Sequence, residues 1–263
     1  MMRLLEFNSD GRFSLTQFPK DKIPPYAILS HTWGEEGDEV TFKDIIKGTG
    51  DHKKGFRKLQ FCCDRAKAND IRYFWVDTCC IDKSSSTELQ TAINSMFLWY
   101  KNAARCYVYL SDVSVNTKDG QPHIDWKSSF RNSRWFTRGW TLQELIAPSI
   151  VEFYSQEHVR LGDKKSLEQP ISDITGIAKE ALQGRKLSDF TVEGRFLWVE
   201  KRQTTIEEDK AYCLLGIFNV FLPLIYSEGQ SNAMRRLNKE IKESASSVLQ
   251  PTGNPLATSL KLR

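Results

Sequence analysis

Apolar residues follow two alternating patterns along the N-terminal part of this chain. Continuous apolar runs, typical of strands buried on both faces, occupy residues 26–30, 73–81, 106–110 and 150–154. Between them, apolar positions spaced three or four apart predict helices over 55–69 and 88–104, and a third helix that contains Trp140 and ends near Pro148. Strand and helix in alternation predict an α/β fold with a parallel sheet and right-handed crossovers.

The pattern changes after Ser155. Residues 159–161 fit one more strand, and helical spacing then predominates over 166–182, 192–200, 207–220 and 231–245. We therefore predict one domain over residues 1–245, in which an α/β core (1–162) carries a packed helical extension (163–245). Residues 246–263 lack periodicity and contain two prolines, so we expect a disordered tail, or a linker where a longer protein has been cut.

The composition excludes some classes of protein but does not indicate a function. Hydrophobic residues at 40% and charged residues at 27% are ordinary for a soluble globular protein. The net charge of +4 is spread among acids, which disfavours nucleic acid as the main partner. No apolar run reaches the ~20 residues that cross a bilayer, and Asp10, Arg12 and Lys20 exclude a signal peptide. We predict no membrane span and a cytoplasmic location.

The six cysteines show neither CxxC nor Cys/His ligand spacing, so we predict no metal site. Cys79 and Cys80 lie in an apolar segment, where packing is the simpler interpretation and a nucleophile the alternative. Motifs of P-loop nucleotidases, Rossmann dehydrogenases, serine hydrolases and zinc peptidases are also absent.

Candidate chemistry gathers where the predicted strands end, because ligands of open parallel sheets bind beyond the carboxyl ends of strands. Residues 30–34 follow the first strand, residues 77–83 the second, and residues 111–112 the third. Trp140 and Glu144 are four residues apart, so both lie on one helical face that would border the same cleft. The alternative is an amphipathic helix with a buried tryptophan and a solvated glutamate.

Other residues near the predicted cleft also have structural interpretations. His31 is either catalytic or a hydrogen-bonded structural histidine. Asp77 either contacts a ligand or caps a turn, and Asp82 is better explained as a turn residue. Trp33 and Trp140 are either core tryptophans or stack on the rings of a ligand. Because both border the same predicted cleft, stacking is favoured.

One prominent carboxylate beside aromatic plates suits cleavage of an N-glycosidic bond with a good leaving group. Such a reaction passes through an oxocarbenium-like state that a single carboxylate stabilises. Nicotinamide leaves NAD+ as a neutral base and needs little acid catalysis. The residues are compatible with this chemistry without requiring it.

Several ordered blocks resemble the fungal heterokaryon-incompatibility (HET) domain, over roughly residues 1 to 245. The blocks are 27–34 (AILSHTWG), 75–83 (WVDTCCIDK), 95–100 (SMFLWY), 107–113 (YVYLSDV), 134–145 (RWFTRGWTLQEL) and 209–217 (DKAYCLLGI). A mild departure is Ser227, where the family usually has glycine. The HET domain is similar to TIR domains, which implies a flavodoxin-like (TIR-like) parallel sheet flanked by helices.

Enzymatic TIR domains hydrolyse NAD+ with the glutamate of a Trp-x-x-x-Glu pattern, which Trp140 and Glu144 match. The resemblance implies that Glu144 is catalytic and that NAD+ is a substrate, with no permanently bound cofactor. The residues expected to line the NAD+ site are Ser30, His31, Thr32, Trp33, Asp77, Cys79, Arg138 and Trp140, although the TIR pattern does not fix His31 or Arg138.

The resemblance also implies a role and partners. It predicts a cell-death effector domain that acts as a homo-oligomer, because a neighbouring subunit completes the site in such enzymes. In the full-length protein a NACHT and repeat sensor region would follow it. The alternative is a non-enzymatic adaptor of the same fold that acts through oligomerisation and partner recruitment.

Overall fold

A seven-stranded sheet forms the centre of the computed structural model, which describes residues 1–8, 11–115, 117–118, 121–122 and 126–248. Its strand order is β2-β1-β4-β3-β5-β8-β9. The strands are β1 (Met2–Phe7), β2 (Phe13–Phe18), β3 (Tyr26–His31), β4 (Tyr73–Trp75), β5 (Arg105–Tyr109), β8 (Val151–Tyr154) and β9 (Arg160–Asp163). A separate two-stranded hairpin joins β6 (Thr117–Lys118) and β7 (Gln121–Pro122).

The four middle strands of the sheet are parallel. Ile28 of β3 pairs with Trp75 of β4 on one side and with Cys106 of β5 on the other, and β8 continues the parallel order beyond β5. Numbered among themselves, these strands have the order 2-1-3-4, which is the flavodoxin-like order. The predicted α/β class is therefore confirmed.

Both edges of the sheet are antiparallel, which the prediction of a parallel sheet did not include. β1 pairs with β2 and, through Leu5 and Phe74, with β4. β9 pairs with β8 after the short turn 155–159. A parallel crossover needs about a dozen residues, so a turn of this length allows only an antiparallel return.

The strand predicted over residues 73–81 is wrong in its length, because the observed strand is shorter. β4 ends at Trp75, and residues Asp77–Cys80 form the helical turn α3, in which the Cys80 amide donates to the Val76 carbonyl at 2.8 Å. A continuous apolar run does not distinguish a buried strand from a buried helical turn. This turn places Asp77 directly beyond the end of β4.

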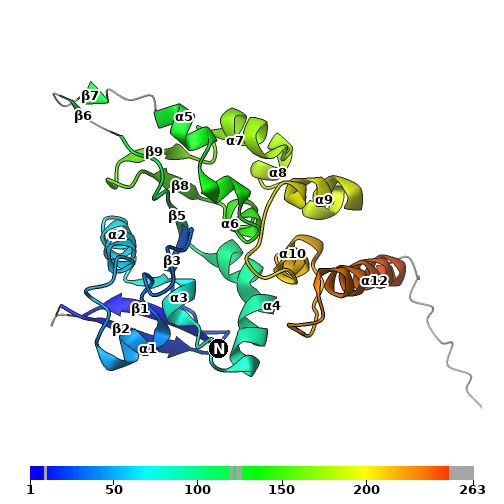
Figure 1. Cartoon of the computed structure of the whole chain (residues 1–263), viewed down its shortest axis with the longest axis horizontal. Coiled ribbons are helices and arrows are strands. Elements are labelled where there is room, and N and C mark those ends of the chain that lie inside the picture. Colours follow the sequence, from blue (N-terminus) through cyan, green and yellow to red (C-terminus); the bar gives the residue numbers. More distant parts are fainter. Residues whose placement is uncertain (9–10, 116, 119–120, 123–125, 249–263) are drawn as a thin grey trace, which may run out of the picture.

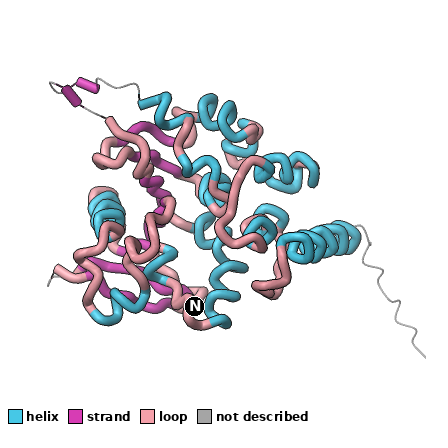
Figure 2. The backbone as a smooth tube through the Cα atoms, viewed as in Figure 1, coloured by secondary structure: helices cyan, strands magenta, loops and turns pink. Residues whose placement is uncertain are grey.

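Helices cover both faces of the sheet. Figure 1 shows α2 on one face and α4 with α6 on the other, as right-handed crossovers require, and Figure 2 shows the strands running between these layers. The helices of this part are α1 (Phe42–Lys47), α2 (Phe56–Lys67), α4 (Ser86–Asn102), α5 (Trp126–Arg131) and α6 (Thr141–Ile146), with the 3-10 helix η1 (Arg134–Thr137) before α6.

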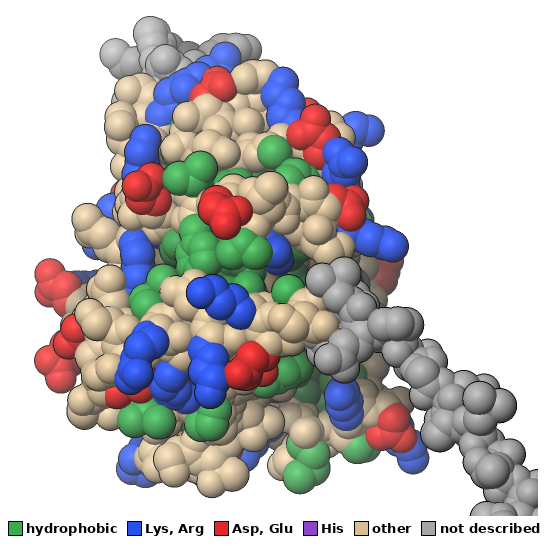
Figure 3. Space-filling model, turned by 90° about the vertical axis from the view of Figure 1, so that its right-hand side faces the viewer, with side chains coloured by type: hydrophobic (Ala, Val, Ile, Leu, Met, Phe, Trp, Pro, Cys, Tyr) green, Lys and Arg blue, Asp and Glu red, His purple; other side chains and the backbone are tan. Residues whose placement is uncertain are grey.

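The remaining helices pack on α4 and α6 through α11 and α8. They are α7 (Glu168–Thr175), α8 (Lys179–Leu182), the 3-10 helix η2 (Leu187–Asp189), α9 (Val192–Glu200), α10 (Asp209–Tyr212), α11 (Leu215–Phe218) and α12 (Gln230–Val248). Figure 3 shows the face on which α10 and α12 lie, where hydrophobic side chains gather in the middle beside Lys and Arg side chains. Within the described ranges, no helix is both long and apolar enough to cross a membrane.

Three boundaries in this part differ from the prediction. The helix expected over 166–182 is divided at Gly176, which ends α7 with a φ of 68°, and the one expected over 207–220 is divided into α10 and α11. α12 extends to Val248, so residues 246–248 of the expected tail are helical. Buried Leu237 and Ile241 anchor this helix, and extending an existing helix costs little. Residues 249–263 lie outside the described residues.

Gly216 marks the closest approach between the extension and α4. A Cβ atom at this position would lie 2.0 Å from the Cβ of Phe97. The two backbones therefore meet where only a glycine fits.

We expect Gly216→Ala to lower the free energy of unfolding by roughly 1–3 kcal/mol or more, because the added methyl forces α11 away from α4. Urea denaturation measures this. Gly194→Ala in α9 is the control, since its Cβ would meet only the Thr191 hydroxyl, at 3.0 Å. Equal stability of Gly216→Ala and wild type would contradict this packing.

Candidate functional site

A cavity of about 420 Å³ lies beyond the carboxyl ends of β3 and β4. Its walls come from the segments that follow these two strands, from α4, from the start of α6, and from the extension. The volume is in the range of small-molecule sites, and the position is where open α/β sheets bind ligands. The cavity is therefore the candidate functional site.

Glu144 lies in the wall of this cavity and is buried, with 7% of the residue exposed. The Ser30 hydroxyl at the end of β3 donates to Glu144 Oε2 at 2.5 Å. Trp135 Nε1 donates to Ser30 Oγ at 2.8 Å, which leaves the hydroxyl hydrogen directed at the carboxyl group. Ser30 thus lies behind Glu144 and fixes its orientation.

Burial raises the pKa of Glu144 to about 8, because water no longer solvates the charged form. Asp77 raises it further, while Ser30, Tyr100 and Arg138 act in the opposite direction. The hydroxyl of Tyr100 donates to the Leu29 carbonyl at 2.9 Å, so its only hydrogen is already used. The carboxyl group is therefore mostly neutral at pH 7 in the free protein.

Asp77 is a second carboxyl group at this cavity, in a different environment. His31 Nε2 lies 3.0 Å from Oδ1, and Trp33 Nε1 donates to Oδ2 at 2.9 Å. The Lys83 ammonium lies 3.9 Å from Oδ2 and 3.7 Å from the centre of the Trp33 ring. Although burial acts to raise it, these partners hold the pKa of Asp77 well below its usual range. Asp77 is thus an ionised group that orders the loop residues around it.

Trp140 occupies the position before the first residue of α6 and already has helical φ and ψ angles. The four-residue spacing therefore brings Trp140 and Glu144 to the same cavity, as predicted. The indole Nε1 donates to Asp209 Oδ2 at 2.9 Å, and the Tyr226 hydroxyl donates to Asp209 Oδ1 at 3.1 Å. The tryptophan ring is consequently held from the extension.

The structure brings most of the predicted site residues together, but not all. His31, Trp33 and Arg138 line the cavity with Asp77, Trp140 and Glu144. Ser30, Thr32 and Cys79 do not line it, contrary to expectation, and Ser30 instead lies behind Glu144. Thr32 follows the last residue of β3 and is buried, and its carbonyl accepts a hydrogen bond from Lys58 Nζ at 3.0 Å.

Cys79 is completely buried in α3, and its thiol donates to the Val40 carbonyl at 3.1 Å. Burial raises the pKa of this thiol well above its usual value, which makes it a poor nucleophile. Packing is therefore the better interpretation of this cysteine.

Sequence reasoning missed two sets of cavity residues. Ile93, Met96 and Tyr100 form part of the apolar stripe of α4, which was interpreted only as a packing surface. Ile206 and Asp209 come from the extension, which was not expected to reach the site. Asp209 begins one of the blocks of the family resemblance, and this was the only signal available.

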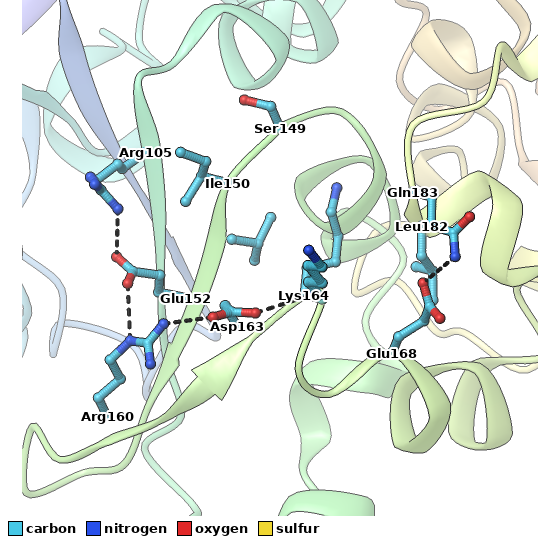
Figure 4. Close-up of a pocket in the computed structure, with 12 residues that line it drawn as sticks. Arg105, Ser149, Ile150, Glu152, Arg160, Asp163, Lys164, Glu168, Leu182 and Gln183 are labelled. Atoms are coloured by element: carbon cyan, nitrogen blue, oxygen red, sulfur yellow. Dashed lines mark hydrogen bonds and ion pairs between the residues drawn. The ribbon is translucent and has the colours of Figure 1, made fainter.

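A larger cavity of about 720 Å³ lies at the opposite ends of β5 and β8 (Figure 4). Four of its charged groups pair with one another: Glu152 lies between Arg105, at 3.5 Å, and Arg160, at 3.0 Å, and Arg160 also contacts Asp163 at 2.7 Å. Lys164, Lys165 and Glu168 line the cavity outside these ion pairs. Across the residues described, no three His, Cys, Asp or Glu side chains are grouped to hold a metal ion.

Comparisons with known proteins agree with the resemblance seen in the sequence. Residues 26–126 match the model of the heterokaryon incompatibility protein (HET) family. Over 241 residues, 91% of this chain, the sequence is 56% identical to "Vegetative incompatibility protein HET-E-1" of Podospora anserina. The aligned part is only 18% of that protein, so the chain spans less than a fifth of its length. No solved structure matches the chain.

The buried carboxyl of Glu144 makes stability depend on pH. The unfolded chain releases this proton near 4.5 and the folded protein near 8, so the folded state binds more protons in between and loses stability as pH rises through that window. Glu144→Gln has no such proton. Relative to wild type, we expect Glu144→Gln to gain on the order of 3 kcal/mol between about pH 5 and pH 8.

Urea denaturation at the two pH values measures this gain. Glu168→Gln is the matched control, because this glutamate hydrogen-bonds only to Gln183 near the surface. A constant difference between Glu144→Gln and wild type at both pH values would show that Glu144 ionises normally.

Proposed function

We propose that the chain is a cell-death effector of vegetative incompatibility that hydrolyses NAD+, on the premise that residues 26–126 match the model of the heterokaryon incompatibility protein (HET) family. The identity with a vegetative incompatibility protein supports the biological role. The observation that carries the enzymatic part is the buried carboxyl of Glu144 beside aromatic side chains at the carboxyl ends of the parallel strands.

The site offers four properties that suit NAD+ hydrolysis. The apolar stripe of α4 excludes water, and Trp33 and Trp140 are flat surfaces for aromatic rings. Glu144, once ionised, places a negative charge beside the cation that develops on the ribose. Lys83 and Arg138 at the cavity are positive groups that suit the pyrophosphate of the dinucleotide.

In the reaction, the bond between the anomeric carbon and the nicotinamide nitrogen breaks, and its electron pair leaves with neutral nicotinamide. The ribose becomes an oxocarbenium ion, which the Glu144 carboxylate stabilises. The oxygen of a water molecule then adds to the anomeric carbon and releases one proton. The products are nicotinamide, ADP-ribose and that proton.

The raised pKa of Glu144 links substrate binding to ionisation. In the free protein the carboxyl group is mostly protonated at pH 7. A pyridinium cation nearby favours the charged form, so NAD+ binding would release a proton and create the carboxylate where it is needed.

The remaining parts of the proposal concern partners. Because the chain spans 18% of the incompatibility protein it matches, we propose that a NACHT and repeat sensor region belongs to the full-length protein. We also propose that self-association in the cytoplasm switches the domain on.

A direct test follows nicotinamide release from NAD+ by chromatography, with the domain fused to an oligomeric scaffold. We expect release by wild type, and a loss of roughly a hundredfold or more in Glu144→Gln, because the charge that stabilises the cation is gone. Glu168→Gln should behave as wild type. Activity that rises with protein concentration in the unfused domain would support self-association.

Two results together would favour the adaptor function instead. One is the absence of nicotinamide release above background in the oligomeric preparation. The other is unchanged killing by Glu144→Gln when the full-length protein is expressed in cells.

The pH dependence of the rate is a separate prediction. Because kcat/KM reports the free protein, it should rise about tenfold per pH unit and level off above about 8, the pKa of Glu144. Initial rates at low NAD+ concentration between about pH 6 and pH 9 measure this profile. A flat profile would mean that the ionised carboxylate is not required.

A further inference from the structure

Residues 202–209 of the extension, called the strap from here on, cross the start of α6. The Gln203 amide donates to the Thr137 carbonyl at 2.6 Å, and the Gly139 amide donates to the Gln203 carbonyl at 2.8 Å. These two bonds form a parallel bridge between the strap and the segment that leads to Trp140. The strap therefore pairs in register with the residues directly before α6.

A buried guanidinium anchors the beginning of the strap. Arg202 is 3% exposed, and its Nη1 donates to the Arg138 carbonyl at 2.9 Å and to Thr141 Oγ1 at 2.8 Å. Burial lowers its pKa to about 10, so it remains charged at neutral pH. Separating a buried charged group from its hydrogen-bond partners costs free energy. The Arg202 guanidinium therefore fixes the strap against α6.

The middle of the strap allows almost no space for movement towards α6. A Cβ atom at Gly139 would lie 2.6 Å from Thr204 Cγ2 and 3.3 Å from Cys213 Sγ. Gly139 has no positive φ, so its role is this close contact rather than an unusual backbone conformation.

The end of the strap faces the cavity. Thr205, Ile206 and Asp209 line it together with Tyr226, and Thr205 Oγ1 accepts a hydrogen bond from Arg138 at 3.3 Å. Asp209 accepts from both Trp140 and Tyr226. Without the strap, the Trp140 indole would lose its hydrogen-bond partner and the cavity would lose one wall.

We propose that the strap is a wall of the nucleotide pocket that the extension supplies within the same chain, and that Asp209 is a positioning residue that holds the Trp140 ring. The identity of the nucleotide rests on the proposed function, whereas docking of the strap does not. The extension is thus a part of the site. Displacement of the strap is a way to lower the affinity of the site for the nucleotide.

The first experiment displaces the strap and then restores it. Gly139→Ala places a methyl against Thr204 Cγ2, and Thr204→Ser removes that methyl while keeping the hydroxyl. We expect Gly139→Ala to speed hydrogen exchange at the amides of positions 139 and 203, and to raise KM for NAD+ on the order of tenfold or more with less effect on kcat. The double variant Gly139→Ala/Thr204→Ser should recover both, and Thr204→Ser alone should match wild type.

The second experiment removes the hydrogen bonds that Asp209 accepts from Trp140 and Tyr226. Asp209→Ala should raise KM as Gly139→Ala does, and Asp209→Asn, which keeps one acceptor oxygen, should raise it less. Asp189→Asn is the matched control, because Asp189 pairs with Arg185 at the surface. Unchanged KM in Asp209→Ala, with normal exchange at positions 139 and 203, would overturn the positioning role.

A readout without NAD+ separates failure of this proposal from failure of the proposed function. If the strap is a wall of the cavity, Gly139→Ala admits water to Glu144. The stability that Glu144→Gln gains over its parent as pH rises should then be smaller when both proteins also carry Gly139→Ala. If exchange at position 203 speeds up while this difference stays the same, the strap is not a wall, whether or not the protein hydrolyses NAD+.

Discussion

The hydrogen bond between the Ser30 hydroxyl and the Glu144 carboxyl is the interaction on which the rest of the site depends. It joins the end of β3 to α6 in the interior, and Trp135 fixes the hydroxyl from the other side. A buried carboxyl group without partners is very costly, so sheet and helix must meet in this one arrangement. That arrangement places a buried carboxyl group in the wall of an apolar cavity.

The two carboxyl groups at the cavity differ because of their surroundings. Lys83 and the hydrogen bonds from His31 and Trp33 keep Asp77 ionised despite its burial. At Glu144 burial raises the pKa and favours the neutral form, because the Ser30 hydroxyl and the charge of Arg138 do not offset it. Titratable groups whose pKa values are pushed apart commonly have different roles. Here Asp77 orders the loops, and Glu144 is the group suited to chemistry.

The extension connects this site to the rest of the chain. Its strap makes main-chain bonds to Thr137 and Gly139, and Asp209 holds the Trp140 ring. Since α11 packs tightly on α4 at Gly216, both helices that border the cavity also contact the extension. A movement of the extension would therefore reach the cavity directly.

The sequence by itself determined the parallel strands at 26–30, 106–110 and 150–154, because buried strands require continuous apolar runs. It also determined that Trp140 and Glu144 share one face, because helical spacing fixes that geometry. It did not determine that residues 77–80 form a helical turn, since a buried turn and a buried strand have the same apolar pattern. Only the tertiary structure decided that Cys79 packs away from the cavity and that Asp209 completes it, because long-range contacts depend on how distant segments pack rather than on local periodicity.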